Sequence, residues 1–589
     1  MDFFSVLTMI GGLALFLFGM HIMGEALSQL SGGRLESILE KLTNTPIKAV
    51  LVGAGVTAVI QSSSATTVMV VGFVNSGIMK LQQAVGIIMG ANIGTTITSW
   101  ILGLAGLDSD SFFIQLLKPT SFSPVLAIIG VAMIMFSKKE KKITIGTILI
   151  GFAVLMFGMD TMSEAVKPLR DVPEFTSILT RFSNPILGMI AGLILTAVIQ
   201  SSSASVGILQ ALCQTGAVSY GAAIPIIMGQ NIGTCVTAMI SSVGASKNAR
   251  RTALIHLYFN LIGTVLFMVV FYAINAINPF AFMTESATPW GIAVVHSIFN
   301  VAATLVLLPF SRLLVKLATL TIKDVEVQEE VTEEKKILGL LDARFLDTPS
   351  YAVEQARNVT CYMAELAEES MNLALGLLSQ YDVEKADRVV WLEAEVDRFE
   401  DQLGSYLVKV STRNLPEGDN NTLNALLHCI GDFERITDHA RNLKEAAEEM
   451  YKKELSFSEK AVEELAIFGN AIREVLKTTV ESFKNNDVDL ASMVEPLEDV
   501  IDGLSMDVKQ RHIKRLRKGK CTIELGFILS DITTDLERVS DHCSNIAVGL
   551  IESKKSEFDA HAYTEKLKRA DNVDFAGRVM VFQKKYQLP

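Results

Sequence analysis

The sequence Gln61-Ser62-Ser63-Ser64-Ala65 recurs in this chain of 589 residues as Gln200-Ser201-Ser202-Ser203-Ala204, an offset of 139 residues. The same offset carries Gly90-Ala91-Asn92-Ile93-Gly94-Thr95 onto Gly229-Gln230-Asn231-Ile232-Gly233-Thr234. One constant offset without a gap over such a length indicates an internal duplication. We therefore expect two structural repeats with the same architecture.

Apolar runs surround these motifs and are long enough to cross a bilayer, which takes about 20 residues. The two runs that the Gln-Ser-Ser-Ser motifs interrupt, about 46–76 and 185–215, are predicted to be re-entrant helical hairpins. We expect membrane spans at about 5–25, 82–105, 121–136, 143–162, 221–243, 253–277 and 289–315.

Basic residues set the predicted orientation, because lysine and arginine favour cytoplasmic loops. Clusters at 138–142 and 247–251 therefore place two loops in the cytoplasm. Counting back from them, the span at 5–25 runs inward and its repeat partner at 143–162 runs outward. The repeats are thus predicted to be inverted; their bounds are about 5–136 and 143–278, with a last span at 289–316.

Charge divides the chain into two halves. The whole chain has a net charge of −12, but residues 1–318 carry 17 Lys+Arg against 12 Asp+Glu, which leaves 35 against 52 for residues 319–589. The first half is therefore basic by 5 charges and the second acidic by 17. The acidic half and the lack of a basic stripe with aromatic residues exclude a nucleic-acid partner. The six cysteines form no close pairs, so neither a disulfide framework nor a thiolate zinc site is predicted.

The second half is predicted to be a soluble helical domain at 346–552, after a charged linker at 319–345 and before a C-terminal tail at 553–589. Its sequence also repeats, because Asp432-Phe433-Glu434-Arg435-Ile436-Thr437-Asp438-His439 matches Asp535-Leu536-Glu537-Arg538-Val539-Ser540-Asp541-His542 at an offset of 103. We expect two three-helix bundles and an all-α chain. The six helices are predicted at about 350–380, 384–411, 420–450, 458–485, 488–516 and 522–551.

A Gln-Ser-Ser-Ser cluster inside a membrane segment is costly unless protein or a water-filled cavity surrounds it. Two such clusters in inverted hairpins fit the broken helices of secondary transporters, whose half-helix N-termini bind anions. The Asn-Ile-Gly-Thr segments would add amide and hydroxyl oxygens and glycine-permitted backbone breaks. Neutral oxygen ligands, and the lack of titratable side chains in all four segments, favour Na⁺ over a proton as the coupling ion. The alternative is close helix packing by small residues.

Carboxylate pairs with Glu-x3-Asp spacing lie on one helical face, since residues four apart are neighbours. Facing carboxylates repel unless cations or protons separate them, so a multinuclear metal site is one hypothesis and a solvated acidic face paired with Arg435 and Arg538 is the other. A nearby His439 or His542 would favour a transition metal. The candidate ligands are Glu393 and Asp397, Glu434 and Asp438, Glu498 and Asp502, and Glu537 and Asp541.

Two histidines in the first half repeat at an offset of 40, in His256-x-x-Phe259-Asn260 and His296-x-x-Phe299-Asn300. A buried, hydrogen-bonded imidazole is the favoured interpretation, and a proton-coupled or pH-sensing role remains open.

The motifs resemble those of two known families. The paired Gln-Ser-Ser-Ser and Gly-x-Asn-Ile-Gly-Thr motifs resemble the type II sodium-dependent phosphate cotransporters over about residues 1–318. The (D/E)-x-E-R-(I/V)-x-D-H helices resemble PhoU over about 345–552. The resemblance implies that phosphate and Na⁺ bind between the hairpins, and that a divalent or transition metal binds the Glu-x3-Asp pairs. The implied substrate and Na⁺ site comprises Gln61, Ser62, Ser63, Ser64, Asn92, Thr95, Thr96, Gln200, Ser201, Ser202, Ser203, Asn231 and Thr234.

The sequence therefore predicts a secondary active transporter, not an enzyme, which imports inorganic phosphate with Na⁺ across the cell inner membrane by alternating access. The helical domain is predicted to be cytoplasmic and regulatory. Besides the lipid bilayer, the expected partners are a phosphate-signalling protein or a second copy of the chain. Three alternatives remain open: a membrane-bound phosphate sensor without flux, transport of another oxyanion, and transport in the efflux direction. The family pattern has a fourth Ser in the animal proteins, where this chain has Ala65 and Ala204.

Overall fold

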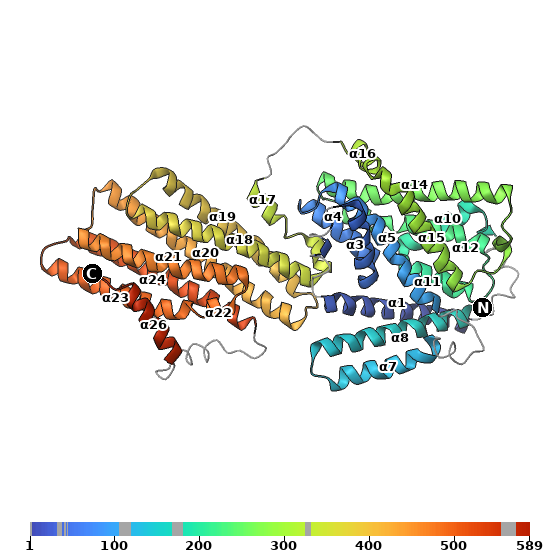
Figure 1. Cartoon of the computed structure of the whole chain (residues 1–589), viewed down its shortest axis with the longest axis horizontal. Helices are drawn as coiled ribbons and strands as arrows, with labels where there is room; N and C mark the ends of the chain where they lie inside the picture. Colours follow the sequence, from blue (N-terminus) through green and yellow to red (C-terminus); the bar gives the residue numbers. More distant parts are fainter. Residues whose placement is uncertain are drawn as a thin grey trace. The chain divides into compact units, whose positions relative to one another are not determined.

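The structure is a computed structural model that describes residues 3–31, 38–39, 43, 45–104, 119–167, 181–323, 332–554 and 573–589. The chain divides into two compact units, Met1–Tyr351 and Ala352–Pro589. Each unit is helical in the parts that the structure describes (Figure 1). Residues 324–331 of the expected linker and 555–572 of the expected tail lie outside the described residues.

The first unit is a set of apolar helices. Within its described residues the only strand-like pairing is one isolated bridge between Ser219 and Ser286. The helices are α1 (Phe3–Ser31), α3 (Pro46–Ile60), α4 (Ser63–Asn75), α5 (Leu81–Gly103), α7 (Pro119–Phe136), α8 (Glu140–Val166), α10 (Pro185–Ile199), α11 (Ser202–Cys213), α12 (Tyr220–Gly233), α13 (Cys235–Ser241), α14 (Lys247–Ile277), α15 (Pro289–Leu307) and α16 (Ser311–Thr321).

Six stretches of the described chain are long and apolar enough to cross a membrane. They coincide with six of the seven spans expected from hydropathy, whereas the expected span at 121–136 falls in α7, whose apolar stretch is shorter. The six stretches are Phe3–Leu30, Leu81–Gly103, Glu140–Val166, Tyr220–Ser241, Lys247–Ile277 and Pro289–Thr321.

The two interrupted runs fold as pairs of short helices, α3 with α4 and α10 with α11. The arms of each pair are joined by a buried hydroxyl bond at equivalent positions. Thr57 Oγ1 donates to Thr66 Oγ1 at 3.0 Å, and Thr196 Oγ1 donates to Ser205 Oγ at 2.8 Å. The duplicated sequence therefore gives two hairpins of the same construction.

Helices α1 and α8 occupy equivalent positions in the two repeats and pack side by side (Figure 1). A Cβ on Gly12 of α1 would lie 2.7 Å from the backbone nitrogen of Met162, while a Cβ on Gly151 of α8 would lie 2.9 Å from the Cβ of Met23. The start of α1 thus meets the end of α8, so the two helices run antiparallel. Glycine is needed here because any side chain would separate the backbones.

The second unit is a bundle of long amphipathic helices, each of which buries one apolar stripe. Five of its six predicted long helices are continuous. The fifth predicted helix, at 488–516, is instead divided at Ser492–Met493 into α22 and α23, and Pro496 then lies in the first turn of α23, where its missing N–H costs nothing. The helices are α18 (Pro349–Leu377), α19 (Val383–Ser411), α20 (Glu417–Lys452), α21 (Glu459–Asn485), α22 (Val488–Ala491), α23 (Val494–Arg517), α24 (Ile523–Glu552) and α26 (Val573–Lys585).

Candidate functional site

Each hairpin of the first unit turns at the glutamine of its Gln-Ser-Ser-Ser motif. Gln61 ends α3 with φ 60° and Gln200 ends α10 with φ 58°, which is the left-handed region. A residue with a Cβ persists there only where its surroundings hold it. In the first copy the support is visible, because Thr98 Oγ1 donates to Gln61 Oε1 at 2.9 Å and Gln61 Nε2 donates to the carbonyl of Ala58.

The first serine of each motif caps the second helix of its hairpin. Ser62 Oγ accepts from the Ala65 N–H at 3.1 Å, and Ser201 Oγ accepts from the Ala204 N–H at 3.2 Å. Serine is among the preferred residues at this position because its short side chain reaches a backbone donor of the first turn. These two hydroxyls therefore have a structural role in starting α4 and α11.

The second serines of the two motifs meet. Ser63 Oγ and Ser202 Oγ lie 3.3 Å apart although the residues are 139 positions apart in sequence, which is the repeat offset. Ser64 Oγ also donates to the carbonyl of Gln200 at 3.5 Å. The first turns of α4 and α11 consequently converge on one point, where two positive dipole ends and their unpaired N–H groups come together. This arrangement favours an anion without any Lys or Arg in the motifs.

The Asn-Ile-Gly-Thr residues bond within their own helices or to α14. Asn92 Nδ2 donates to Asn260 Oδ1 at 2.8 Å, and Asn231 Nδ2 donates to the carbonyl of Ile227 at 3.0 Å. None of the described hydrogen bonds joins them to a Gln-Ser-Ser-Ser residue. The hydroxyls of the remaining members donate to carbonyls one turn earlier; they are Thr95, Thr96 and Thr234.

The glycines of these segments serve helix packing. A Cβ on Gly94 would lie 2.7 Å from the Cβ of Thr57, and a Cβ on Gly233 would lie 2.7 Å from the Cβ of Thr196. The expected backbone break is found in the second copy, between α12 and α13, but not in the first, where α5 runs through Gly94 without interruption. The expectation of a break in the first copy is therefore wrong, and close packing accounts for its glycine.

The two glutamines have identical motifs and different surroundings. Gln61 is 8% exposed, whereas Gln200 is exposed and lines a cavity of about 590 Å³. Thr237, the counterpart of Thr98, also lines that cavity, and its hydroxyl has no partner among the described residues. The structure is thus closed around Gln61 and open beside Gln200.

His256 and His296 are both fully buried. His296 Nδ1 lies 2.8 Å from Ser99 Oγ on α5, and Asn260 on the His256 helix bonds Asn92, also on α5. These contacts attach α14 and α15 to α5. His296 therefore has the expected buried and hydrogen-bonded imidazole, whereas His256 is buried but neither of its ring nitrogens has a hydrogen-bond partner among the described residues.

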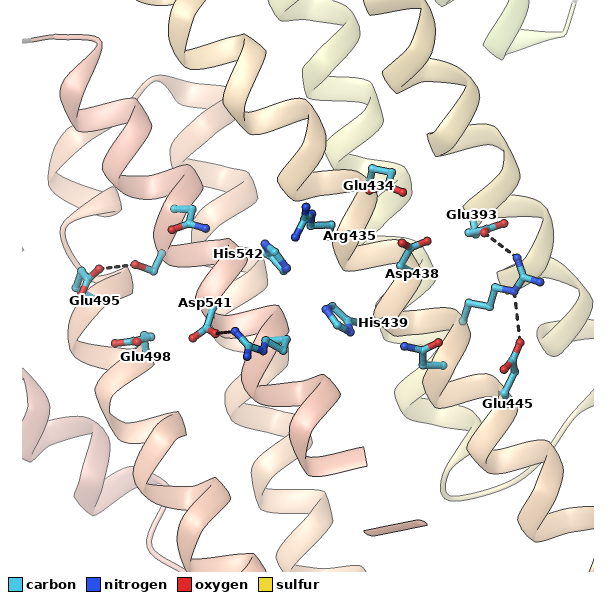
Figure 2. Close-up of a pocket in the computed structure, with 15 residues that line it drawn as sticks. Glu393, Glu434, Arg435, Asp438, His439, Glu445, Glu495, Glu498, Asp541 and His542 are labelled. Carbon is cyan, nitrogen blue, oxygen red and sulfur yellow. Dashed lines mark hydrogen bonds and ion pairs between the residues drawn. The ribbon is translucent and has the colours of Figure 1, made fainter. Parts of the chain in front are cut away.

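A pocket of about 1190 Å³ in the second unit collects residues of both duplicated motifs (Figure 2). At its centre His439 Nδ1 lies 2.8 Å from Asp535 Oδ1, and His542 Nδ1 lies 2.8 Å from Asp432 Oδ1. Each repeat therefore holds the histidine of the other, and the two rings lie with their centroids 5.6 Å apart. An ionised aspartate only accepts, so Nδ1 carries the proton in both rings and each Nε2 remains available as a metal ligand.

Three carboxylates of the second repeat converge, and two of them, Glu498 and Asp541, line this pocket. Ligand oxygens of Glu498, Asp502 and Asp541 lie within 4.8 Å of one another, a spacing that a single cation with bonds of about 2.4 Å can bridge. The chemistry of three oxygen donors fits a divalent ion. Glu537 instead accepts from Ser505 Oγ at 2.7 Å and pairs with Lys509.

Carboxylates of the first repeat also lie close enough to raise one another's pKa, as Glu434 shows. Burial, the neighbouring Asp438 and, more weakly, Glu400 and Asp397 raise the pKa of Glu434 to about 7. A proton on such a carboxyl group relieves the repulsion between neighbouring carboxylates, as a bound cation would. Glu393 accepts from Arg441 Nη1 at 2.8 Å and so is already paired with a cation.

Arginines partly satisfy the acidic face, as the alternative interpretation required. Arg538 Nη1 lies 3.3 Å from Asp541 Oδ2 in an exposed pair, and Arg435 points into the pocket (Figure 2). Exposed pairs of this kind contribute little stability, so they leave Asp541 able to bind a cation.

Sequence reasoning missed three acidic residues of this pocket region. Asp432 and Asp535 hold the histidines, and their place at the head of the repeated motif was the signal for them. Glu495 is buried, lines the pocket and accepts from Ser544 Oγ, but no pattern in the sequence marked it.

Comparison with family models gives one match in each half of the chain. Residues 15–164 and 170–284 match the family described as Na+/Pi-cotransporter. Residues 361–447 and 465–548 match the PhoU domain.

Individual relatives match different shares of the chain. YjbB of Salmonella typhimurium, whose name describes inorganic phosphate export, is 24% identical over 566 residues, which cover 95% of this chain and 100% of that one. The human sodium-dependent phosphate transport protein 2B is 26% identical over 231 residues, 36% of this chain and 32% of its own. The crystal structure of PhoU from Pseudomonas aeruginosa aligns with a TM-score of 0.33 and 20% identity, and covers 36% of this chain and 100% of that one.

Proposed function

Because the chain belongs to the Na+/Pi-cotransporter family and carries a PhoU domain, we propose that it moves inorganic phosphate across the cell inner membrane together with Na⁺. The family and the six apolar helices make it a multi-pass membrane protein that transports phosphate and is not an enzyme. The observation that carries the proposal is the 3.3 Å contact between Ser63 and Ser202 at the convergent ends of α4 and α11.

Phosphate binds where these helices begin. The N–H groups of the first turns and the hydroxyls of Ser63 and Ser202 donate to its oxygens, while the two helix dipoles compensate its negative charge. Binding by dipoles and hydroxyls, rather than by lysine or arginine, lets the anion leave again because the site carries no full opposite charge. Ser62 and Ser201 act through the caps that fix the direction of α4 and α11.

Sodium binds to neutral oxygens beside the anion. The C-terminal ends of α3 and α10 lie at the same hairpin turns, and the negative dipole ends of these helices attract cations. Gln61 Oε1 and the hydroxyl of Thr98 add oxygen ligands in the first copy.

Inversion of the repeats supports alternating access. The equivalent helices α1 and α8 run antiparallel, and the equivalent residues Ser63 and Ser202 face each other across the hairpins, as an inverted duplication requires. Gln61 is enclosed whereas Gln200 borders a cavity, so the two hairpins have unequal surroundings, as in any single state of such a carrier.

The helical unit is a cytoplasmic regulatory domain that binds a divalent or transition metal. Glu498, Asp502 and Asp541 are the proposed ligands because their oxygens already converge. A bound cation would remove the repulsion among these carboxylates and so stabilise the bundle.

Flux through liposomes tests this function. The purified full chain is expected to accumulate radiolabelled phosphate when Na⁺ is higher outside, and not when choline replaces Na⁺. Equal accumulation under a proton gradient without Na⁺ would contradict sodium coupling. Binding of phosphate without accumulation under either gradient would instead indicate a membrane-bound sensor.

Export of phosphate is the second candidate, since the relative that covers 95% of this chain has a name that describes export. Liposomes loaded with labelled phosphate separate the two directions. Release that requires no Na⁺ gradient would favour export, whereas uptake that follows the Na⁺ gradient would favour import.

A further inference from the structure

Residues 332–351, which precede the helical unit, belong to the first unit and pack into it. The segment contains α17 (Glu333–Leu338) and the 3₁₀ turn η5 (Ala343–Asp347), and it ends at Tyr351, where the first unit ends. Phe345 and Tyr351 are 0% exposed, and Leu346 is buried. A charged connector would leave such side chains in water, so this segment has a specific docking place.

Aromatic contacts attach the segment to α4 of the first hairpin. The Phe345 ring lies 5.4 Å from the Phe73 ring and 5.1 Å from the Tyr351 ring, centroid to centroid. A Cβ on Gly72 would lie 2.7 Å from Cε1 of Phe345. Gly72 therefore lets the phenylalanine lie directly on the helix backbone.

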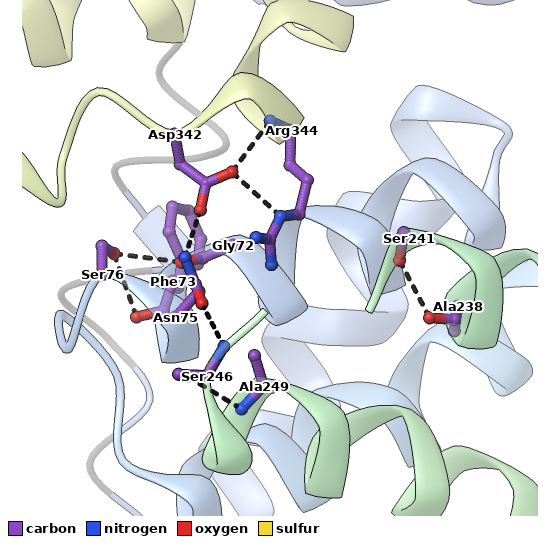
Figure 3. A network of polar contacts seen from close by, with 10 residues as sticks. All are labelled: Gly72, Phe73, Asn75, Ser76, Ala238, Ser241, Ser246, Ala249, Asp342 and Arg344. Atoms are coloured by element: carbon purple, nitrogen blue, oxygen red, sulfur yellow. Dashed lines mark hydrogen bonds and ion pairs between the residues drawn. The ribbon is translucent and has the colours of Figure 1, made fainter. Parts of the chain in front are cut away.

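Polar contacts tie the same segment to two parts of the transporter unit (Figure 3). Asp342 Oδ2 accepts from Asn75 Nδ2 at 2.7 Å, while its Oδ1 accepts from the backbone N–H of Arg344 and pairs with Arg344 Nε, both at 2.9 Å. Asn75 Oδ1 accepts from the Ser246 N–H at 2.8 Å, in the loop before α14. Asp342 is only 8% exposed, so these donors replace the water that its oxygens lose on burial.

The docked segment also forms one wall of the cavity that opens beside Gln200. Asp342, Ala343, Arg344 and Asp347 line it together with Gln200 of the second motif. Other lining residues come from the hairpin helix α4 and from the end of α13 and the loop after it; they are Val68, Thr237, Ile240, Ser241 and Val243. The segment thus lines a cavity that also reaches Gln200 of the second Gln-Ser-Ser-Ser motif.

We propose that residues Asp342–Asp347 are a gate for phosphate at this end of the transport path, latched to the first hairpin by the Asp342–Asn75 bond and by Phe345. The inference rests on the proposed transport function, since a gate needs a path. A closed latch holds α4, which must move if the site is to change sides. The gate also precedes Pro349, the first residue of α18, whose later residues belong to the helical unit, so that unit is linked to the gate through one continuous helix.

A cysteine at Ser241 reports on the gate, because Ser241 lines the cavity and its hydroxyl donates to the carbonyl of Ala238 in its own helix. The full chain with Ser241→Cys is placed in nanodiscs and treated with a water-soluble maleimide, and the modified peptide is counted by mass spectrometry. Adding Asp342→Ala is expected to raise the labelling rate about tenfold, which corresponds to about 1.4 kcal/mol of latch free energy.

The matched control is Glu333→Ala, which removes a carboxylate from the same docked segment, at an exposed position of α17 outside the residues that line the cavity. It should change the labelling rate less than about twofold. An equal rise in both variants would mean that the lost charge alone changes the labelling rate of the thiol. No rise with Asp342→Ala would mean that the segment does not restrict access to the cavity. Either result contradicts the gate. If Asp342→Ala does not fold, Asp342→Asn and Phe345→Leu replace it with the same expectation.

Phosphate flux separates failure of the gate from failure of the proposed function. If the gate and the transport function are both correct, Asp342→Ala increases the labelling rate and changes the rate of phosphate uptake, whereas Glu333→Ala leaves uptake near that of the parent. If Asp342→Ala increases labelling in a chain that moves no phosphate, the transport function is refuted, and with it the role of the segment as a gate for phosphate. The docking contact between Asp342 and Asn75 would still stand.

Discussion

Replacing Ser202 by alanine is the sharpest test of how the anion is bound. Ser202 Oγ lies 3.3 Å from Ser63 Oγ where α4 and α11 converge, so one hydroxyl of the proposed donor set is lost and the backbone is retained. A hydrogen bond to a charged group contributes about 1.5–3 kcal/mol, so the KM for phosphate should rise about 10- to 150-fold. The assay is initial uptake by liposomes over a range of phosphate concentrations.

Two further single variants, one at the facing serine and one at a serine away from the site, serve as comparisons for Ser202→Ala. Ser63→Ala should raise KM by a similar factor, and the double variant should lose less than the sum of the two free energies, because residues in contact are not additive. Ser163→Ala is the matched control, since this buried serine donates to the carbonyl of Ala211, away from the hairpin turns. A KM that changes less than about twofold in Ser202→Ala, with uptake intact, would refute the assignment of this hydroxyl to phosphate.

Three other predictions concern packing, pH and metal. Gly158→Leu should lower stability by about 3 kcal/mol, seen as a lower melting temperature, because its Cβ would lie 2.7 Å from the Gly12 carbonyl on α1. In the metal-free chain, the pKa of Glu434 is raised from an ordinary 4.5 to about 7, so the folded state binds this proton more tightly than the unfolded state does. The contribution of Glu434 to the free energy of unfolding of the helical unit should therefore be largest below pH 4.5 and decrease as the pH rises through about 7. In Glu434→Gln the free energy of unfolding should vary less with pH over this range. Asp541→Asn should remove most of the bound metal, as measured by elemental analysis. Glu537→Gln should retain the metal, because Glu537 is turned toward Ser505. Equal losses of metal in the two variants would contradict the ligand assignment.

Much of the architecture follows from pattern alone. Apolar length located the membrane helices, and the 139-residue offset predicted two hairpins of one design. The meeting of Ser63 with Ser202 is what duplicated and inverted hairpins would produce, since equivalent residues lie near the symmetry axis. The six long helices of the second unit likewise follow from a period of 3.6 residues, apart from the interruption before Pro496.

Other features depend on tertiary contacts that local sequence does not encode. Gln61 and Gln200 have the same motif, so only the structure distinguishes the closed copy from the open one. The charged stretch before the helical domain was expected to be a linker, yet Asp342 bonds Asn75 across 267 residues. The ion-pair partners of Glu393 and Glu537, Arg441 and Lys509, come from other helices, and spacing within one helix cannot show them.

The central claim is that phosphate and Na⁺ cross the membrane in one coupled step at the convergent hairpins. Its most direct test is influx of radioactive sodium into liposomes that contain the full chain, measured with and without external phosphate. The account predicts that phosphate stimulates sodium influx, that sulfate at the same concentration does so far less, and that Ser202→Ala shifts the stimulation to higher phosphate concentration. Sodium influx that does not respond to phosphate, in a preparation that still takes up phosphate, would contradict it.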